Sequence, residues 1–126
     1  MNIEFGIVDN ALASLCKALS QPPKNDLERD GVIQRFEYSF ELIWKVAKRV
    51  LNRAGVPSAS PRAVIRHLAQ QGFLENAEGW LTFLNARNYT SHTYNEAVAM
   101  WVFSQCEPFA QAAEKLLAKL KDELKK

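Results

Sequence analysis

The segment RNYTSHTY (87–94) brings Arg87, His92 and Tyr94 within one short stretch of the chain. A histidine can take up or release a proton near neutral pH, and an arginine presents a planar, permanently charged fork of donors to phosphate oxygens. Together they suit RNA cleavage. The imidazole would deprotonate the ribose 2′-hydroxyl or protonate the leaving 5′-oxygen, and the guanidinium would stabilise charge on the phosphate. The alternative is that Arg87 and His92 are unrelated solvated groups, because pairs with this spacing are common.

The two groups can act together only if the chain bends between them. In one continuous helix Arg87 and His92 would lie roughly 140° apart around the axis, so they could not share a face. The segment is rich in indifferent or poor helix formers, namely Asn88, Tyr89, Thr90, Ser91 and Thr93. Thr93 and Glu96 form the capping-box pattern T-x-x-E. We therefore predict a break between Arg87 and Thr93 and a new helix from Tyr94, with an N-terminus that favours phosphate.

The elements around this bend are predicted to be helices, with no convincing strand. Apolar residues recur at three- and four-residue steps, and caps, prolines and glycines divide the pattern. The expected helices cover about 3–19, from the Asn25 cap to Gly55, from Ser60-Pro61 to Gly72, from about Asn76 to the bend, and from Tyr94 to the tail, with a kink or brief break at Pro108. The fold class is therefore an all-α bundle of four to five helices in a single domain, 1–126.

Composition limits the other possibilities. A net charge of +2 is too small to indicate a nucleic-acid binder by itself, so any phosphate site must be local. Cys16 and Cys106 lie on apolar stripes without metal-ligand spacing, so we expect reduced thiols, no metal and no cofactor. The N-terminus lacks the features of a secretory signal, and no apolar run could span a bilayer. We therefore expect a cytoplasmic protein without a membrane partner.

Three stretches resemble the HEPN superfamily, particularly the small bacterial HEPN proteins encoded beside a minimal nucleotidyltransferase. RNYTSHTY fits R-x-x-x-x-H-x-Y, with a polar residue directly after the arginine. RFEYSFELIWK (35–45) resembles the start of the long helix in the branch described as nucleotidyltransferase substrate-binding proteins, and SPRAVIRHLAQQGFL (60–74) resembles that branch's next segment. The resemblance covers roughly residues 30 to 100 in the same order and spacing.

This resemblance implies an up-and-down helical bundle that forms a homodimer and brings two copies of the motif into one cleft. It implies a metal-independent endoribonuclease, the toxin of a toxin–antitoxin pair, with Arg87 and His92 as the catalytic pair and Asn88 as the supporting polar residue. The partner nucleotidyltransferase would act as antitoxin by AMPylation, the attachment of AMP, at Tyr94. The alternative within the same resemblance is a non-catalytic subunit that binds a substrate or nucleotide for that nucleotidyltransferase.

One carboxylate outside the motif is a candidate supporting residue. Glu37 lies at the border of the apolar face of the second predicted helix. A carboxylate there could orient His92 or Arg87, or it could simply pair with any nearby base. Glu41 and Lys45, four residues apart on a more exposed side, are interpreted as a simple helix pair.

Overall fold

A computed structural model describes residues 2–126, and within this range the chain is helical and contains no strand. The elements are α1 (Gly6–Leu19), α2 (Asp26–Arg53), α3 (Pro61–Gln70), α4 (Ala77–Asn88), the short 3₁₀ helix η1 (Thr90–His92) and α5 (Glu96–Leu124). The prediction of an all-α bundle is confirmed. None of the helices in residues 2–126 is long and apolar enough to cross a membrane.

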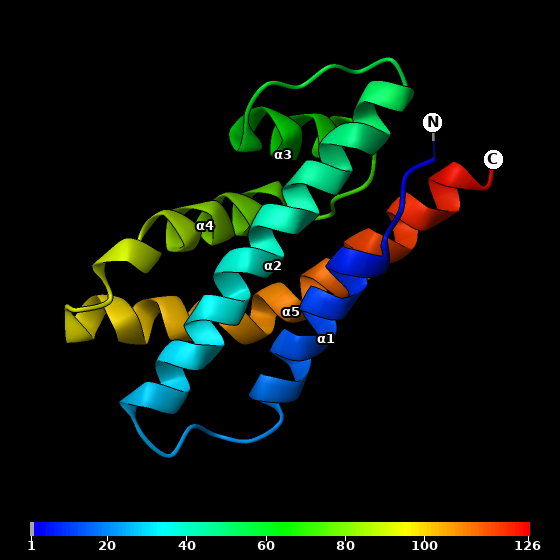
Figure 1. The fold of residues 1–126 in the computed structure, drawn as a ribbon. Helices are drawn as coiled ribbons and strands as arrows, with labels where there is room; N and C mark the ends of the chain where they lie inside the picture. Colours follow the sequence, from blue (N-terminus) through cyan, green and yellow to red (C-terminus); the bar gives the residue numbers. More distant parts are fainter. Residues whose placement is uncertain (1) are drawn as a thin grey trace.

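Helix α2 is the spine of the bundle, because it contacts every other helix and η1. In Figure 1, α3 and α4 lie on one side of α2 and α1 lies on the other, while α5 passes along the bundle and contacts both α1 and α4. The two ends of the chain lie near the same end of the bundle (Figure 1). There Lys121 of α5 donates to both carboxylate oxygens of Asp9 in α1, each at 2.9 Å.

Aromatic rings fill the centre, where α2, α4 and α5 meet. The ring of Phe109 lies edge-on to Phe36, Phe83 and Trp80, with centroid distances of 5.1, 5.5 and 5.7 Å. Edge-to-face pairs of this kind add to the stability gained from burying the rings. Because Phe83 and Trp80 lie in α4, this packing fixes the position of the helix that carries Arg87 in its last turn.

Local signals set most helix ends. Asn25 and Ser60 accept hydrogen bonds from the backbone N–H groups of Glu28 and Ala63, at 2.8 and 3.2 Å. After α2 and α3 the chain turns at Gly55 and Gly72, whose φ angles of 83° and 85° favour glycine. α1 begins at Gly6 instead of the predicted start at about residue 3. Of the kink or brief break predicted at Pro108, the break is absent, because α5 continues through this residue as one helix.

Candidate functional site

The chain bends between α4 and α5, as predicted. Helix α4 ends at Asn88, a single 3₁₀ turn follows, and α5 begins at Glu96. The predicted start at Tyr94 and the predicted cap at Thr93 are wrong. Asn95 caps α5 by accepting from the backbone N–H of Val98 at 3.2 Å, whereas the Thr93 hydroxyl donates to the carbonyl of Thr90 at 3.4 Å. The 3₁₀ turn takes up Thr90–His92, so the capping residue lies two positions later than the T-x-x-E pattern indicates.

The bend is held by its own short-range hydrogen bonds. The Thr90 hydroxyl donates to the carbonyl of Arg87 at 2.7 Å, and the backbone N–H of His92 donates to the carbonyl of Tyr89 at 2.9 Å. The N–H of Asn95 then donates to the carbonyl of His92 at 3.1 Å. The Thr90 side chain thus competes for a backbone carbonyl at the point where the helix stops.

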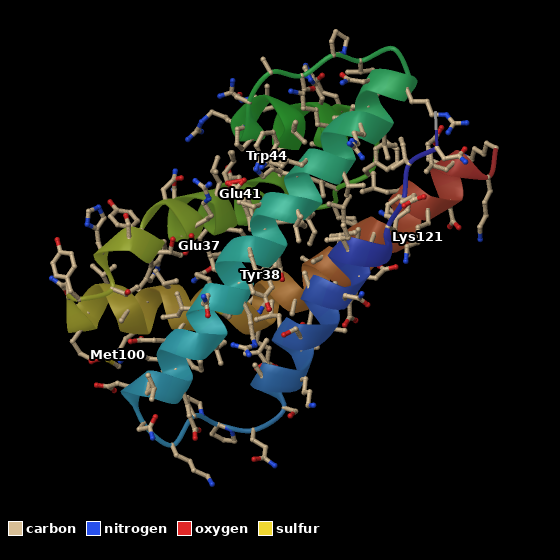
Figure 2. The ribbon with its side chains drawn as sticks, in the orientation of Figure 1. Glu37, Tyr38, Glu41, Trp44, Met100 and Lys121 are labelled. Carbon is tan, nitrogen blue, oxygen red and sulfur yellow. The ribbon has the colours of Figure 1, made fainter. Side chains whose placement is uncertain are left out.

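Arg87 reaches from the last turn of α4 to the middle of α2. Its Nη2 forms an ion pair with Oε1 of Glu41, and its Nη1 donates to Oδ1 of Asn88 at 3.4 Å. The other carboxylate oxygen of Glu41 accepts from the indole Nε1 of Trp44 at 2.8 Å, and Nζ of Lys45 lies 3.9 Å away (Figure 2). The carboxylate is thus held by an indole and in turn holds the guanidinium.

The expected contact of Glu37 with Arg87 or His92 is not present within the described chain. Glu37 is exposed and forms no hydrogen bond or ion pair with any of residues 2–126, and the contact with Arg87 belongs to Glu41, one turn later (Figure 2). Sequence reasoning found the Glu41–Lys45 pair but missed the role of Glu41 toward Arg87. A signal was available, because Trp44 lies three residues after Glu41 and a partly buried indole N–H needs an acceptor.

His92 lies in an exposed row of rings, formed by Trp101, Tyr89, His92 and Tyr94. Successive ring centroids are 5.9, 6.3 and 5.9 Å apart. The Tyr94 hydroxyl lies 3.4 Å from Nδ1 of His92, and Tyr94 is 86% exposed. The imidazole and the phenol are therefore both open to a large substrate or a partner protein.

The structure does not join Arg87 to His92 directly. Among residues 2–126 no hydrogen bond connects the two side chains, and each has its own partners. They lie at the two ends of the same bend, one on α4 and one on η1. Two groups that act on different atoms of one phosphodiester need not touch each other, because each must reach only its own atom.

The N-terminus of α5 is not the open anion site that the sequence suggested. Asn95 already supplies an oxygen to the first turn, and Glu96 places a carboxylate there. Arg29 of α2 donates to Oε2 of Glu96 at 3.0 Å, and this hydrogen bond raises the pKa of Arg29. An incoming phosphate would meet the carboxylate of Glu96 at this helix end, so the predicted anion site at the start of α5 is not open.

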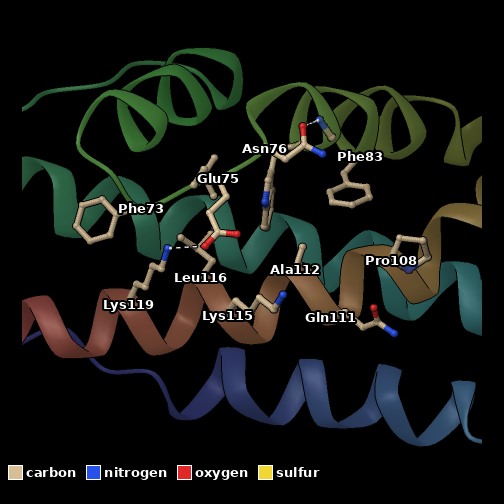
Figure 3. Close-up of a pocket in the computed structure, with 13 residues that line it drawn as sticks. Phe73, Glu75, Asn76, Phe83, Pro108, Gln111, Ala112, Lys115, Leu116 and Lys119 are labelled. Atoms are coloured by element: carbon tan, nitrogen blue, oxygen red, sulfur yellow. Dashed lines mark hydrogen bonds and ion pairs between the residues drawn. The ribbon is translucent and has the colours of Figure 1, made fainter.

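A separate cleft of about 290 Å³ opens between α4 and α5 (Figure 3). Trp80 and Phe83 form part of its wall, and Lys115 and Lys119 line it from α5. Lys119 lies 3.9 Å from a carboxylate oxygen of Glu75. None of the motif residues lines this cleft. In the described part of the chain, no three His, Cys, Asp or Glu side chains gather closely enough to hold a metal ion.

Known proteins are similar to this chain in sequence and in fold. A curated relative, "Probable ribonuclease HepT" of Haemophilus influenzae, is 31% identical over 96 residues, which is 72% of this chain. The matched region spans 66% of that relative's length, slightly under two thirds. A protein of known crystal structure from Thermus thermophilus is 36% identical with a TM-score of 0.85, over 90% of this chain and 98% of its own.

A second solved structure, from Haemophilus influenzae, is described as the fold of a substrate binding domain of a nucleotidyltransferase. It is 27% identical with a TM-score of 0.84, over 94% of this chain and 99% of its own. The family described as "Nucleotidyltransferase substrate binding protein like" matches residues 4–122, well beyond the range in which the sequence motifs were noted. This chain therefore belongs to the nucleotidyltransferase substrate-binding-protein-like family, the small HEPN branch that its motifs resemble.

Proposed function

We propose that this chain is a metal-independent endoribonuclease and the toxin of a toxin–antitoxin pair, acting on RNA in the cytoplasm. Arg87 and His92 are its catalytic pair, and Asn88 supports Arg87. The observation that carries the proposal is the bend, which presents the exposed imidazole of His92 beside the helix end that carries Arg87. The similarity to a protein named as a probable ribonuclease supports the same reading.

The proposed step is an internal transfer within the RNA. His92 accepts the proton of a ribose 2′-hydroxyl, the 2′-oxygen forms a bond to the adjacent phosphorus, and the bond from phosphorus to the 5′-oxygen breaks. The leaving 5′-oxygen takes up a proton, which the second histidine of a dimer can supply. The products are a 2′,3′-cyclic phosphate and a free 5′-hydroxyl. Arg87 stabilises the charge on the non-bridging oxygens as the 2′-oxygen attacks.

A homodimer would bring two such motifs together. The row of rings beside the bend exposes Tyr89 at 49%, Trp101 at 38% and the neighbouring Met100 at 61%. Aromatic residues and methionine are enriched in protein interfaces. These exposed side chains support a dimer in which the motif of each protomer faces the other.

The partner nucleotidyltransferase would neutralise the enzyme through Tyr94. In this step the phenol oxygen attacks the α-phosphorus of ATP, the bond to the β-phosphate breaks, and pyrophosphate leaves with the phenolic proton released to solvent. The 86% exposure of Tyr94 and its position 3.4 Å from Nδ1 of His92 support this assignment. An AMP group there adds bulk and negative charge beside His92, and it would compete with RNA for Arg87.

The ribonuclease proposal is tested with purified protein and RNA in the presence of a chelator. We expect products with cyclic phosphate ends, and a loss of about a hundredfold or more in rate in His92→Ala and Arg87→Ala. His67→Ala is the matched control, because His67 is the other histidine of the chain and its Nδ1 pairs with Ser58 far from the motif. Intact RNA with the wild-type protein, or equal cleavage by His92→Ala, would contradict the proposal.

The Tyr94 proposal needs a separate test. The chain is coexpressed with its nucleotidyltransferase partner and its intact mass is measured. One added adenylate is expected in the wild type and in Tyr89→Phe, and none in Tyr94→Phe. Modification that persists in Tyr94→Phe would assign it to another residue.

A second candidate function is a non-catalytic subunit that holds a nucleotide for the nucleotidyltransferase. The cleft in Figure 3 favours it, because Lys115 and Lys119 line it and an ammonium group can bind a phosphate. The Haemophilus structure described as a substrate binding domain also agrees with it. ATP that quenches tryptophan fluorescence in the wild type but not in Trp80→Phe, together with intact RNA, would favour this function over cleavage.

A further inference from the structure

One segment of the chain contains basic residues but no acidic ones. Residues 42–74 contain six lysines and arginines and no aspartate or glutamate, whereas all fourteen acids and the other ten bases lie outside this segment. The near-neutral net charge of +2 therefore conceals a strong local imbalance. The six bases are Lys45, Lys48, Arg49, Arg53, Arg62 and Arg66.

These six side chains lie on the second half of α2 and on α3, which pack against each other. All except the partly exposed Lys48 are exposed. Within the described residues only Lys45 has an acid within ion-pair distance, and that acid is Glu41 at 3.9 Å. We call these six side chains together the basic face, with four of them along α2 and two on α3.

The basic face begins next to the catalytic arginine. Glu41, which binds Arg87, and Lys45, Lys48 and Asn52 follow one another at steps of four, three and four residues, so they share one side of α2. From Lys45 to Arg53 the helix axis extends about 12 Å. This length corresponds to three or four phosphates, since successive nucleotides of a stacked strand are spaced about 3.4 Å apart along its axis.

The surface chemistry favours a nucleic acid over a protein partner. No large apolar side chain of residues 42–74 is among the exposed ones, which are Ile7, Leu27, Tyr38, Tyr89, Tyr94, Met100 and Trp101. A stable protein interface needs an apolar centre, whereas protein–nucleic acid interfaces are polar and strongly positive. Four of these seven, Tyr89, Tyr94, Met100 and Trp101, lie at or beside the row of rings, whereas Ile7 lines a hollow together with Lys45, Lys48 and Arg49.

We propose that the basic face binds the phosphate backbone of the RNA beside the cleavage site, an inference that rests on the RNA substrate of the proposed function. Backbone contacts of this kind position a strand without reading its sequence. The basic face therefore sets affinity and the direction of the strand, and Arg87 and His92 act on the phosphodiester that reaches the bend.

The test measures binding apart from cleavage. The probe is a single-stranded RNA oligonucleotide with 2′-O-methyl riboses, which cannot be cleaved because the attacking hydroxyl is blocked. The variant K45Q/K48Q/R49Q and the second variant R62Q/R66Q are compared with the control K24Q/K125Q/K126Q, which removes three exposed lysines elsewhere. Kd is measured over a range of salt concentrations, and circular dichroism checks that each variant is folded.

We expect K45Q/K48Q/R49Q to raise Kd about tenfold and to lower the slope of log Kd against log salt by about 2, since each single-strand phosphate contact contributes about 0.7. R62Q/R66Q should lower the slope by about 1.4, and the control should leave the slope unchanged. Equal slopes in all three variants, or no binding by the wild type, would overturn the inference. Unchanged RNA binding with lost binding of the nucleotidyltransferase would also overturn it and would assign the basic face to an acidic protein surface.

The two proposals can fail independently. If the wild type cleaves unmodified RNA while the basic-face variants bind the probe normally, the inference fails and the ribonuclease function stands. If the probe binds through the basic face and unmodified RNA stays intact, the ribonuclease proposal is contradicted and the RNA-binding role of the basic face is supported.

Discussion

Arg87 at the end of α4 is held by Glu41 in the middle of α2, and the same carboxylate accepts a hydrogen bond from Trp44 at 2.8 Å. The side chains of Arg87 and Glu41 are 34% and 23% exposed, so the pair lies at the edge of the bundle and is partly shielded from water. The ion pair fixes one Nη of the guanidinium and leaves other donors free. Glu41 therefore acts as a positioning residue in the proposed reaction.

Glu41→Gln is expected to lower kcat for RNA cleavage about tenfold without raising KM, because a misplaced guanidinium stabilises the transition state less well. The free energy of unfolding should change by no more than about 1 kcal/mol, since partly exposed ion pairs contribute little. Glu37→Gln is the matched control, because it removes a carboxylate one turn earlier that has no partner among residues 2–126. Equal kcat values in the two variants would show that Glu41 does not position Arg87.

The start of α5 can be tested by removing, one at a time, the two side chains that could cap it. Asn95→Ala should lower the free energy of unfolding by about 1 kcal/mol, since it leaves the N–H of Val98 without its acceptor. Thr93→Ala should cost less than about 0.5 kcal/mol, because its hydroxyl makes a single long hydrogen bond to Thr90. Urea unfolding of both variants measures the difference. A larger loss of stability in Thr93→Ala than in Asn95→Ala would instead support the capping box at Thr93 that the sequence indicates.

Ser39 offers a test of the core. Its Oγ is buried in α2 and has no hydrogen-bond partner among residues 2–126, which carries a desolvation cost. Ser39→Ala is therefore expected to raise the free energy of unfolding by about 1 kcal/mol. Ser14→Ala should lower it, because the Ser14 hydroxyl accepts from Arg35 at 3.1 Å and from Tyr38 at 3.0 Å. A Ser39→Ala protein less stable than wild type would contradict this account.

Cys16 should react slowly with alkylating agents until the pH is high. Burial and the nearby carboxylate of Glu114, which accepts from the thiol at 3.3 Å, raise the pKa of Cys16 to about 11. Only the thiolate reacts, so the alkylation rate should be low at pH 8 and rise through about pH 11. Glu114→Gln should shift the midpoint downward, because it removes the negative charge while burial remains.

Cys106 provides the internal comparison for this measurement. It is fully buried, and burial raises the pKa of its thiol to about 12. It should stay unmodified at pH 11 in the folded protein and react once denaturant is added. Alkylation of Cys16 with a midpoint near pH 9, the ordinary value for a cysteine thiol, would contradict both the burial of this thiol and its contact with Glu114.

The sequence by itself determined the helices and the bend, because these depend on neighbours along the chain. The spacing of apolar residues, the caps at Asn25 and Ser60, and the poor helix formers after Arg87 each act within a few residues. The same local rules failed where two signals competed. Thr93 and Asn95 can both cap a helix, and the 3₁₀ turn at Thr90–His92 decided between them.

Only the tertiary structure decided which carboxylate meets Arg87. Glu37 and Glu41 lie one turn apart on α2, and both are near the side that faces α4 (Figure 2). Which of them reaches the arginine depends on where α4 crosses α2, where Trp80 of α4 packs on Phe40 of α2 and both rings pack on Phe109 of α5. Contacts between helices depend on how side chains from distant parts of the chain fit together. The spacing of residues along one helix does not contain that information.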